Sequence, residues 1–75
     1  MCIAVPGEII GVFPTRAKVT MVGVETTINI QMIENPQIGE FVLVHAGCAI
    51  ERIDREYYDA FFTMMKPLLD EDEKG

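Results

Sequence analysis

Polar and apolar side chains alternate along much of the first 53 residues of this chain, and this pattern restricts the fold more than any other feature. An alternation with a period of two is typical of β-strands that are buried on one face. Pro14, Gly23 and Gly47 interrupt the pattern at points where turns are expected. Together with residues 34–39, which have the composition of a loop, the interruptions leave five strand-like segments, which are residues 3–13, 16–22, 24–33, 40–46 and 48–53. Five short strands without intervening helices predict a small closed or nearly closed β-barrel.

Three of these segments carry further information. Residues 16–22 and 24–33 are separated only by Gly23, so we expect them to form a hairpin. Residues 40–46 are apolar on both faces, which indicates a central strand or a strand that another element covers on one side. Residues 48–53 form either a short strand of their own or a bulged extension of the strand before them.

After residue 53 the apolar side chains recur every three or four residues, which predicts an amphipathic helix. Asp54 is a good N-cap, and Pro67 is expected to end or kink the helix near Lys66. The main apolar stripe is Tyr57, Phe61, Met64, Met65 and Leu68, and Tyr58, Phe62 and Leu69 widen it. We expect the main stripe to pack on the barrel, while the wider arc leaves partner docking as an alternative. The sequence therefore predicts one domain over residues 1–75, mainly β, with the barrel in 2–53 and a helix with an acidic tail in 54–75.

Charge and hydropathy exclude several classes of partner. Twelve acidic and six basic residues give a net charge of −6, which argues against nucleic acids and anionic membranes. No stretch approaches the roughly 20 apolar residues that span a bilayer. No signal peptide precedes Cys2, so we expect a cytoplasmic protein.

The second residue is a cysteine, and its small side chain favours removal of Met1. The mature chain would then begin with an α-amino group and a thiol on one residue, which can chelate a metal ion or attack an electrophile. Reference pKa values of about 7.7–8.0 for the amine and about 8.5 for the thiol leave both groups partly deprotonated in a cell. Cys2 therefore ranks first among the candidate functional residues.

His45 and Cys48 are the other candidates for chemistry. A lone histidine at a strand end is more often structural than a ligand, but His45 would meet Cys2 if the first strand lay beside residues 40–46. Cys48 is expected to pack in the core as a small apolar residue. A disulfide between Cys2 and Cys48 does not suit a reducing cytosol. A structural zinc site is a weak alternative, since Cys2, His45 and Cys48 would still need a fourth ligand.

Two segments resemble a known family. Residues 1–7 read MCIAVPG and residues 39–50 read GEFVLVHAGCAI, and both are similar to motifs of the HypC/HupF family of hydrogenase maturation chaperones. The resemblance covers almost the whole chain, including the spacing between the motifs and the terminal helix. It implies a small OB-like β-barrel of about five strands followed by one C-terminal helix. Many family members have an aromatic residue where this chain has Cys48.

The resemblance also implies a function, which is that of a scaffold and carrier with no enzymatic activity. Such a protein binds HypD, meets HypE through the HypC–HypD complex, and contacts the precursor of the hydrogenase large subunit. It takes part in the assembly and transfer of an Fe(CN)2CO group, a transient cargo, with no permanently bound cofactor. By resemblance Cys2 is the functional residue and His45 shares or tunes the iron ligation. Ile3, Val5 and Pro6 would then shape the docking surface.

Two alternatives remain open from the residues. The first is a small OB-like module that binds proteins or oligonucleotides and carries no metal, although oligonucleotide binding wants a basic groove and this chain is acidic. The second is a thiol enzyme that uses Cys2 and His45, for which no oxyanion site is evident in the sequence.

Overall fold

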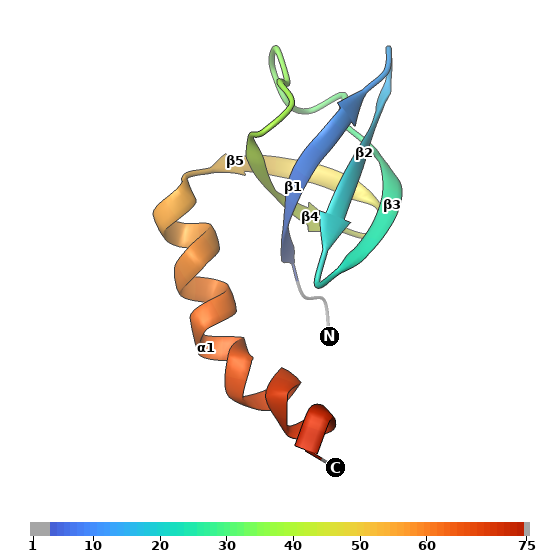
Figure 1. Cartoon of the computed structure of the whole chain (residues 1–75). Coiled ribbons are helices and arrows are strands. Elements are labelled where there is room, and N and C mark those ends of the chain that lie inside the picture. The colour runs from blue at the N-terminus through green and yellow to red at the C-terminus, as the bar shows by residue number, and fades with distance from the viewer. Residues whose placement is uncertain (1–3, 75) are drawn as a thin grey trace.

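A computed structural model describes the backbone of residues 4–74 and the side chains of residues 4–65. Five strands form a closed barrel in the order β1-β2-β3-β5-β4, and one helix follows them (Figure 1). The elements are β1 (Val5–Val12), β2 (Arg16–Met21), β3 (Val24–Asn29), β4 (Phe41–His45), β5 (Cys48–Ile53) and α1 (Arg55–Lys74). The predicted fold class, mainly β with a five-stranded barrel and a C-terminal helix, is confirmed.

Strand β1 has an antiparallel neighbour on each side. It pairs antiparallel with β2 on one side and with β4 on the other, and β2 forms the predicted hairpin with β3. The barrel closes where β3 meets β5 in parallel at Asn29 and Cys48, and the Asn29 amide donates a hydrogen bond of 2.9 Å to the Gly47 carbonyl. Register shifts interrupt the ladders at two places: Ile10 is the extra residue on β1, between Ile9 and Gly11, and Ile50 is the extra residue on β5, opposite Leu43 and Val44. Such bulges bend a strand, which a barrel of only five strands needs in order to close.

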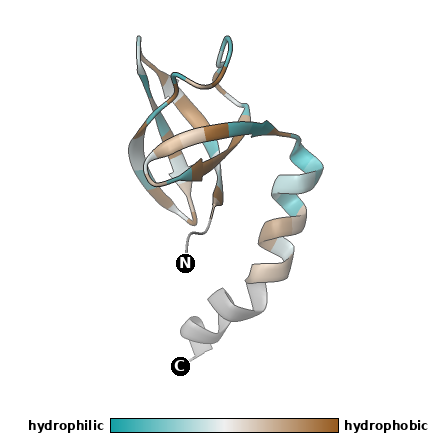
Figure 2. Ribbon diagram, turned by 180° about the vertical axis from the view of Figure 1, so that it is seen from behind, coloured by the Kyte–Doolittle hydropathy of each residue, from teal (hydrophilic) through white to brown (hydrophobic). Residues whose placement is uncertain are grey.

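The core consists of the inward-facing members of the alternating pattern. Ala17 and Val19 on β2, and Val42 and Val44 on β4, are buried as their spacing predicts. The remaining buried apolar residues are Ile9, Ile28, Ile30, Ile33 and Ala49. Figure 2 shows the resulting alternation of apolar and polar residues along the strands. The third predicted strand is shorter than expected, because β3 ends at Asn29 and residues 31–35 form turns and bends.

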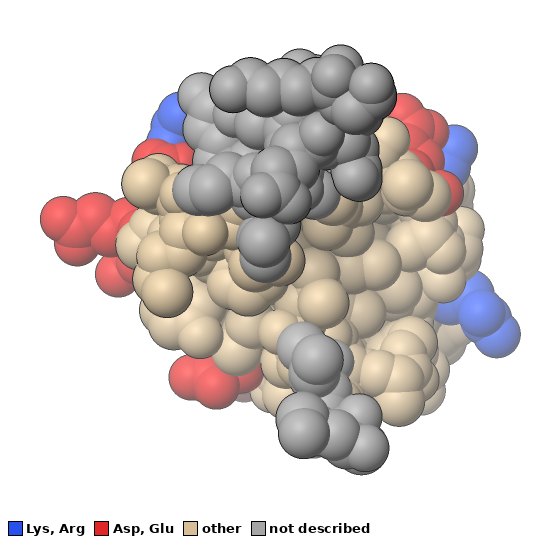
Figure 3. All heavy atoms as spheres, turned by 90° about the horizontal axis from the view of Figure 1, so that it is seen from below, with Lys and Arg blue, Asp and Glu red and all other residues tan. Residues whose placement is uncertain are grey.

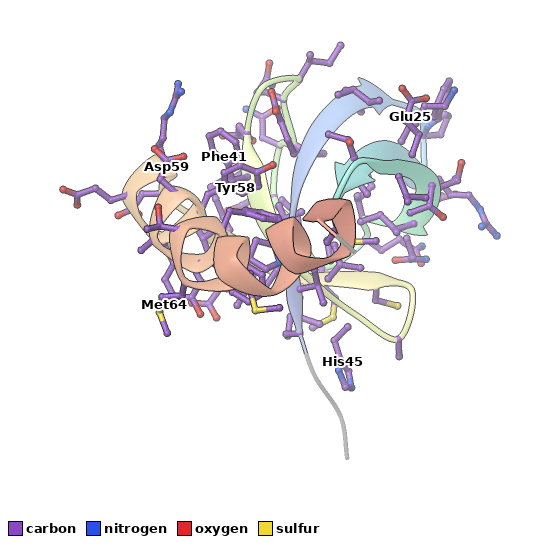
Figure 4. The ribbon with its side chains drawn as sticks, turned by 60° about the horizontal axis from the view of Figure 1, so that its bottom comes forward. Glu25, Phe41, His45, Tyr58, Asp59 and Met64 are labelled. Carbon is purple, nitrogen blue, oxygen red and sulfur yellow. The ribbon has the colours of Figure 1, made fainter. Side chains whose placement is uncertain are left out.

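The helix α1 contacts the outer side of the barrel at β1 and at Phe41 of β4. The Asp54 carboxylate accepts a hydrogen bond of 2.8 Å from the Tyr57 amide, which confirms the predicted N-cap. The Tyr58 ring lies 4.3 Å from the Phe41 ring, centroid to centroid, and 4.8 Å from that of Phe62 (Figure 4). On the second apolar face of β4, Phe41 is therefore covered by another element, in keeping with one of the two arrangements that its sequence allowed.

Two details of the predicted helix are wrong. The half-buried side is formed by Tyr58, Phe61, Phe62 and Met65, whereas Tyr57 and Met64 of the predicted stripe are 51% and 79% exposed. Both sets have helical spacing, and the contact of Tyr58 with Phe41 determines which of them faces the barrel. The helix also continues to Lys74, so an end near Lys66 is wrong, because a proline removes one backbone hydrogen bond without forbidding helical geometry on either side. The alternative outcome, a kink near Lys66, stays a prediction. Within the described part of the chain, no helix is both long enough and apolar enough to cross a membrane.

Candidate functional site

The end of β4 lies beside the start of β1. Val5 pairs with Val44 and Pro6 pairs with Leu43 in an antiparallel register, so the next position along β4 is His45, opposite the residue that precedes β1. The first strand therefore does lie beside the strand that carries His45, which was the condition for a meeting of His45 with Cys2. Cys2 and Ile3 themselves lie outside the described residues.

A tight turn holds His45 in place. Ala46 and Gly47 connect β4 to β5, and both have positive φ, 53° and 78°. This pair of left-handed residues is typical of a type I′ hairpin, whose twist matches that of the strands beside it. The turn pairs His45 directly with Cys48. His45 points away from the barrel interior and is half-buried (Figure 4).

Cys48 does not pack in the core, and that prediction is wrong. Its neighbour Ala49 is fully buried and occupies the inward position of β5. Because side chains alternate across a strand, Cys48 faces outward, on the same face as its cross-strand partner His45. It is a free thiol and only partly covered. The spacing His45-x-x-Cys48 across a predicted turn was the signal in the sequence that could have revealed this pair.

The structure also places two further candidates. Val5 is half-buried at the start of β1, while Pro6 is less than 2% exposed. A buried ring cannot form part of a docking surface, so the expectation for Pro6 needs correction: Pro6 shares the outer face of the barrel with its cross-strand partner Leu43 and is covered there. Gly7 follows it, and a Cβ atom added there would lie 2.8 Å from the Cγ atom of Met21.

The surface at this end of the barrel carries little charge. The hairpin turn between β2 and β3 lies here, beside the start of β1, and its residues Val22 and Val24 are 46% and 64% exposed. In Figure 3, which views the molecule from this end, uncharged side chains fill the described centre and charged ones lie toward the rim. Such a surface suits a protein partner better than a polyanion.

Tyr58 of α1 lies near two carboxylates, those of Glu8 and Asp59. Burial raises the pKa of Tyr58 above 10.0, and the carboxylates of Glu8 and Asp59 raise it further. Glu8 is the cross-strand partner of Phe41, on which the Tyr58 ring packs. Among the described residues, no three His, Cys, Asp or Glu side chains gather into a group that could hold a metal ion.

A second feature, an open hollow, lies at the opposite end of β1. It is formed by the loop after β1 and by the segment that follows β3, and it includes Phe13, Ile30 and Pro36. Of the predicted functional residues that the structure describes, Val5, Pro6 and His45, none lines it. It is separate from the end of the barrel that carries His45.

Comparison with known proteins identifies relatives of the chain. The HupF/HypC family profile matches residues 1–65. A protein named hydrogenase maturation factor HypC from Rhizobium leguminosarum bv. viciae is 33% identical over 67 residues, covering 88% of this chain and 89% of the relative. Proteins of the same name from Escherichia coli K12 and from Synechocystis are 35% and 32% identical, over 85% and 75% of this chain and 82% of each relative.

Proposed function

This chain belongs to the HupF/HypC family and is a hydrogenase maturation chaperone, and we propose that it binds HypD and the hydrogenase large-subunit precursor during assembly of the active site. In this proposal it takes part in building an Fe(CN)2CO group and in transferring it to the [NiFe] site, and HypE meets it through the complex with HypD. The iron group is a cargo that is bound and released. The chain itself performs no catalytic step, and it acts in the cytoplasm, where thiols stay reduced.

The proposed cargo ligands are Cys2 and His45. Two peptide units join Cys2 to Ala4 and span at most about 7 Å. The pairing of Val5 with Val44 sets the start of β1 beside His45, so a thiolate on this short arm is within reach of the imidazole. Iron with cyanide and carbon monoxide ligands is a soft centre for which thiolate is a suitable donor. Few ligands on a terminal arm favour release, which a carrier requires.

The proposed docking surface is the uncharged end of the barrel. Val5, Val22 and Val24 lie at this end and are at least partly exposed. A protein that docks here covers apolar side chains and at the same time encloses the segment that begins with Cys2. We place the contacts with HypD and with the large-subunit precursor on this surface, with Ile3 as a further contact.

The observation that carries the proposal is the register that places His45 beside the start of β1. The test uses a host strain that lacks its own copy of this gene and expresses tagged variants. With Cys2→Ala we expect loss of hydrogenase activity, an unprocessed large subunit and less iron in the purified protein. Thr27→Ala, an exposed change on β3, is the control and retains all three. Normal maturation with Cys2→Ala refutes the proposed role of the thiol.

A further inference from the structure

The pair His45 and Cys48 has the geometry of a chelate. The two residues flank the two-residue turn directly and are partners across the hairpin, so their side chains project from the same face. Directly opposed residues have Cβ atoms about 4.5–5.5 Å apart. An imidazole nitrogen and a thiolate sulfur that extend from such positions can reach one ion between them, at about 2.0–2.1 Å and about 2.3 Å respectively.

The local sequence supports the same conclusion. Two residues separate His45 from Cys48, the spacing at which paired ligands commonly stand in C-x2-C metal sites. Left-handed φ values at Ala46 and Gly47 hold the hairpin in one register and so preorganise both donors. Among the described residues, the side chains of His45 and Cys48 make no hydrogen bond that a metal ion would have to break.

We propose that His45 and Cys48 form a two-donor site for a thiophilic divalent metal ion, such as Zn²⁺ or Co²⁺, on the outer face of the β4–β5 hairpin. Two donors leave open positions for water or for ligands from another molecule, so the site is exchangeable and unlike a closed structural zinc centre. Thiolate and imidazole together select against Mg²⁺ and Ca²⁺, which prefer oxygen ligands.

The site also extends the proposed function. Only this extension rests on the proposed function. His45 is one of the proposed ligands of the iron cargo, and Cys48 would supply a thiolate next to it in addition to that of Cys2. An iron group held near His45 would then find sulfur donors from two different segments of the chain. Metal binding by the hairpin pair does not require that the chain carries this cargo.

The test is a Co²⁺ titration of the purified full-length chain, followed by the absorption that arises from thiolate-to-cobalt charge transfer. All proteins in the series carry Cys2→Ser, so that Cys48 is the remaining thiol. We expect the absorption in Cys2→Ser and its loss when Cys48→Ser is added. Adding His45→Gln should weaken Co²⁺ binding at least about tenfold, since one of two donors is removed. Met32→Ala, which removes a 69% exposed sulfur side chain outside the site, should leave the titration unchanged.

Absence of the thiolate–cobalt absorption in Cys2→Ser overturns the proposal, and so does equal binding with and without His45→Gln. Circular dichroism of each variant shows that the barrel is folded. Protection of Cys48 from alkylation by Zn²⁺ in Cys2→Ser is a second readout that needs no change at the site. Failure of these tests while Cys2→Ala still abolishes maturation rejects only the hairpin site. Binding of Co²⁺ with normal maturation in Cys2→Ala rejects the proposed function and leaves the hairpin site intact.

Discussion

The turn between β2 and β3 holds a β-branched residue in a strained conformation. Val22 has a φ of 51°, in the left-handed region, and Gly23 follows it with a φ of 79°. For an L-residue this region costs roughly 1–2 kcal/mol, and for a β-branched side chain it is rare. Asn is among the residues that tolerate this conformation and is the preferred first residue of such a turn. We therefore expect Val22→Asn to raise the free energy of unfolding by about 1 kcal/mol.

The structure supplies a matched control. Val24 is two residues further on, at the start of β3, and is even more exposed, at 64% against 46% for Val22. It is not among the residues with positive φ, so Val24→Asn relieves no strain. It exchanges a good strand former for a poor one, and we expect a loss of up to about 1 kcal/mol. The same chemical change should thus have opposite signs at positions two residues apart.

Thermal and urea unfolding, followed by circular dichroism, measure both changes. At about 2.1 cal/mol/K per residue, the unfolding entropy of this 75-residue chain is about 0.16 kcal/mol/K. A change of 1 kcal/mol therefore moves Tm by about 6 °C, with the urea m-value unchanged. If Val22→Asn lowers Tm as Val24→Asn does, the inferred strain at the turn is refuted.

Three further predictions concern the packing around β1 and β5. The pKa of Tyr58 is raised in the folded chain, so the contribution of Tyr58 to stability is present below pH 10.0 and is lost as the pH rises through the folded pKa. Tyr58→Phe should therefore flatten the fall in stability at alkaline pH, measured by urea unfolding. An equally steep fall in the variant contradicts this prediction. Gly7→Ala should cost about 1–3 kcal/mol because its Cβ meets Met21 at 2.8 Å, and in a Met21→Ala background the cost in urea unfolding should fall by at least about half. Arg52 donates hydrogen bonds to the Glu34 carbonyl at 2.6 Å and to the Glu40 carboxylate at 3.1 Å. Arg52→Met should therefore lower the free energy of unfolding by about 1 kcal/mol and speed amide hydrogen exchange in residues 34–40. Unchanged exchange would show that these contacts do not hold the loop.

Much of the barrel could be predicted from local pattern. Alternation identified the strands and their inward side chains, such as Val19 and Val42, because one face of each strand packs in the core and the other faces water. The change of period after residue 53, with Asp54 as a cap, was sufficient to predict the helix. The chemistry of Cys2 stays a prediction, because Cys2 lies outside the described residues.

Tertiary pairing decided the rest. The alternating pattern indicates which residues share a face. The register of β4 against β5 determines which face is the inner one at the end of a strand. In this register Cys48 faces outward, beside His45. The burial of Pro6 and the rotation of α1 that brings Tyr58 onto Phe41 have the same origin. Contacts between residues far apart in the chain depend on how the whole barrel closes, and no short window of sequence contains that information.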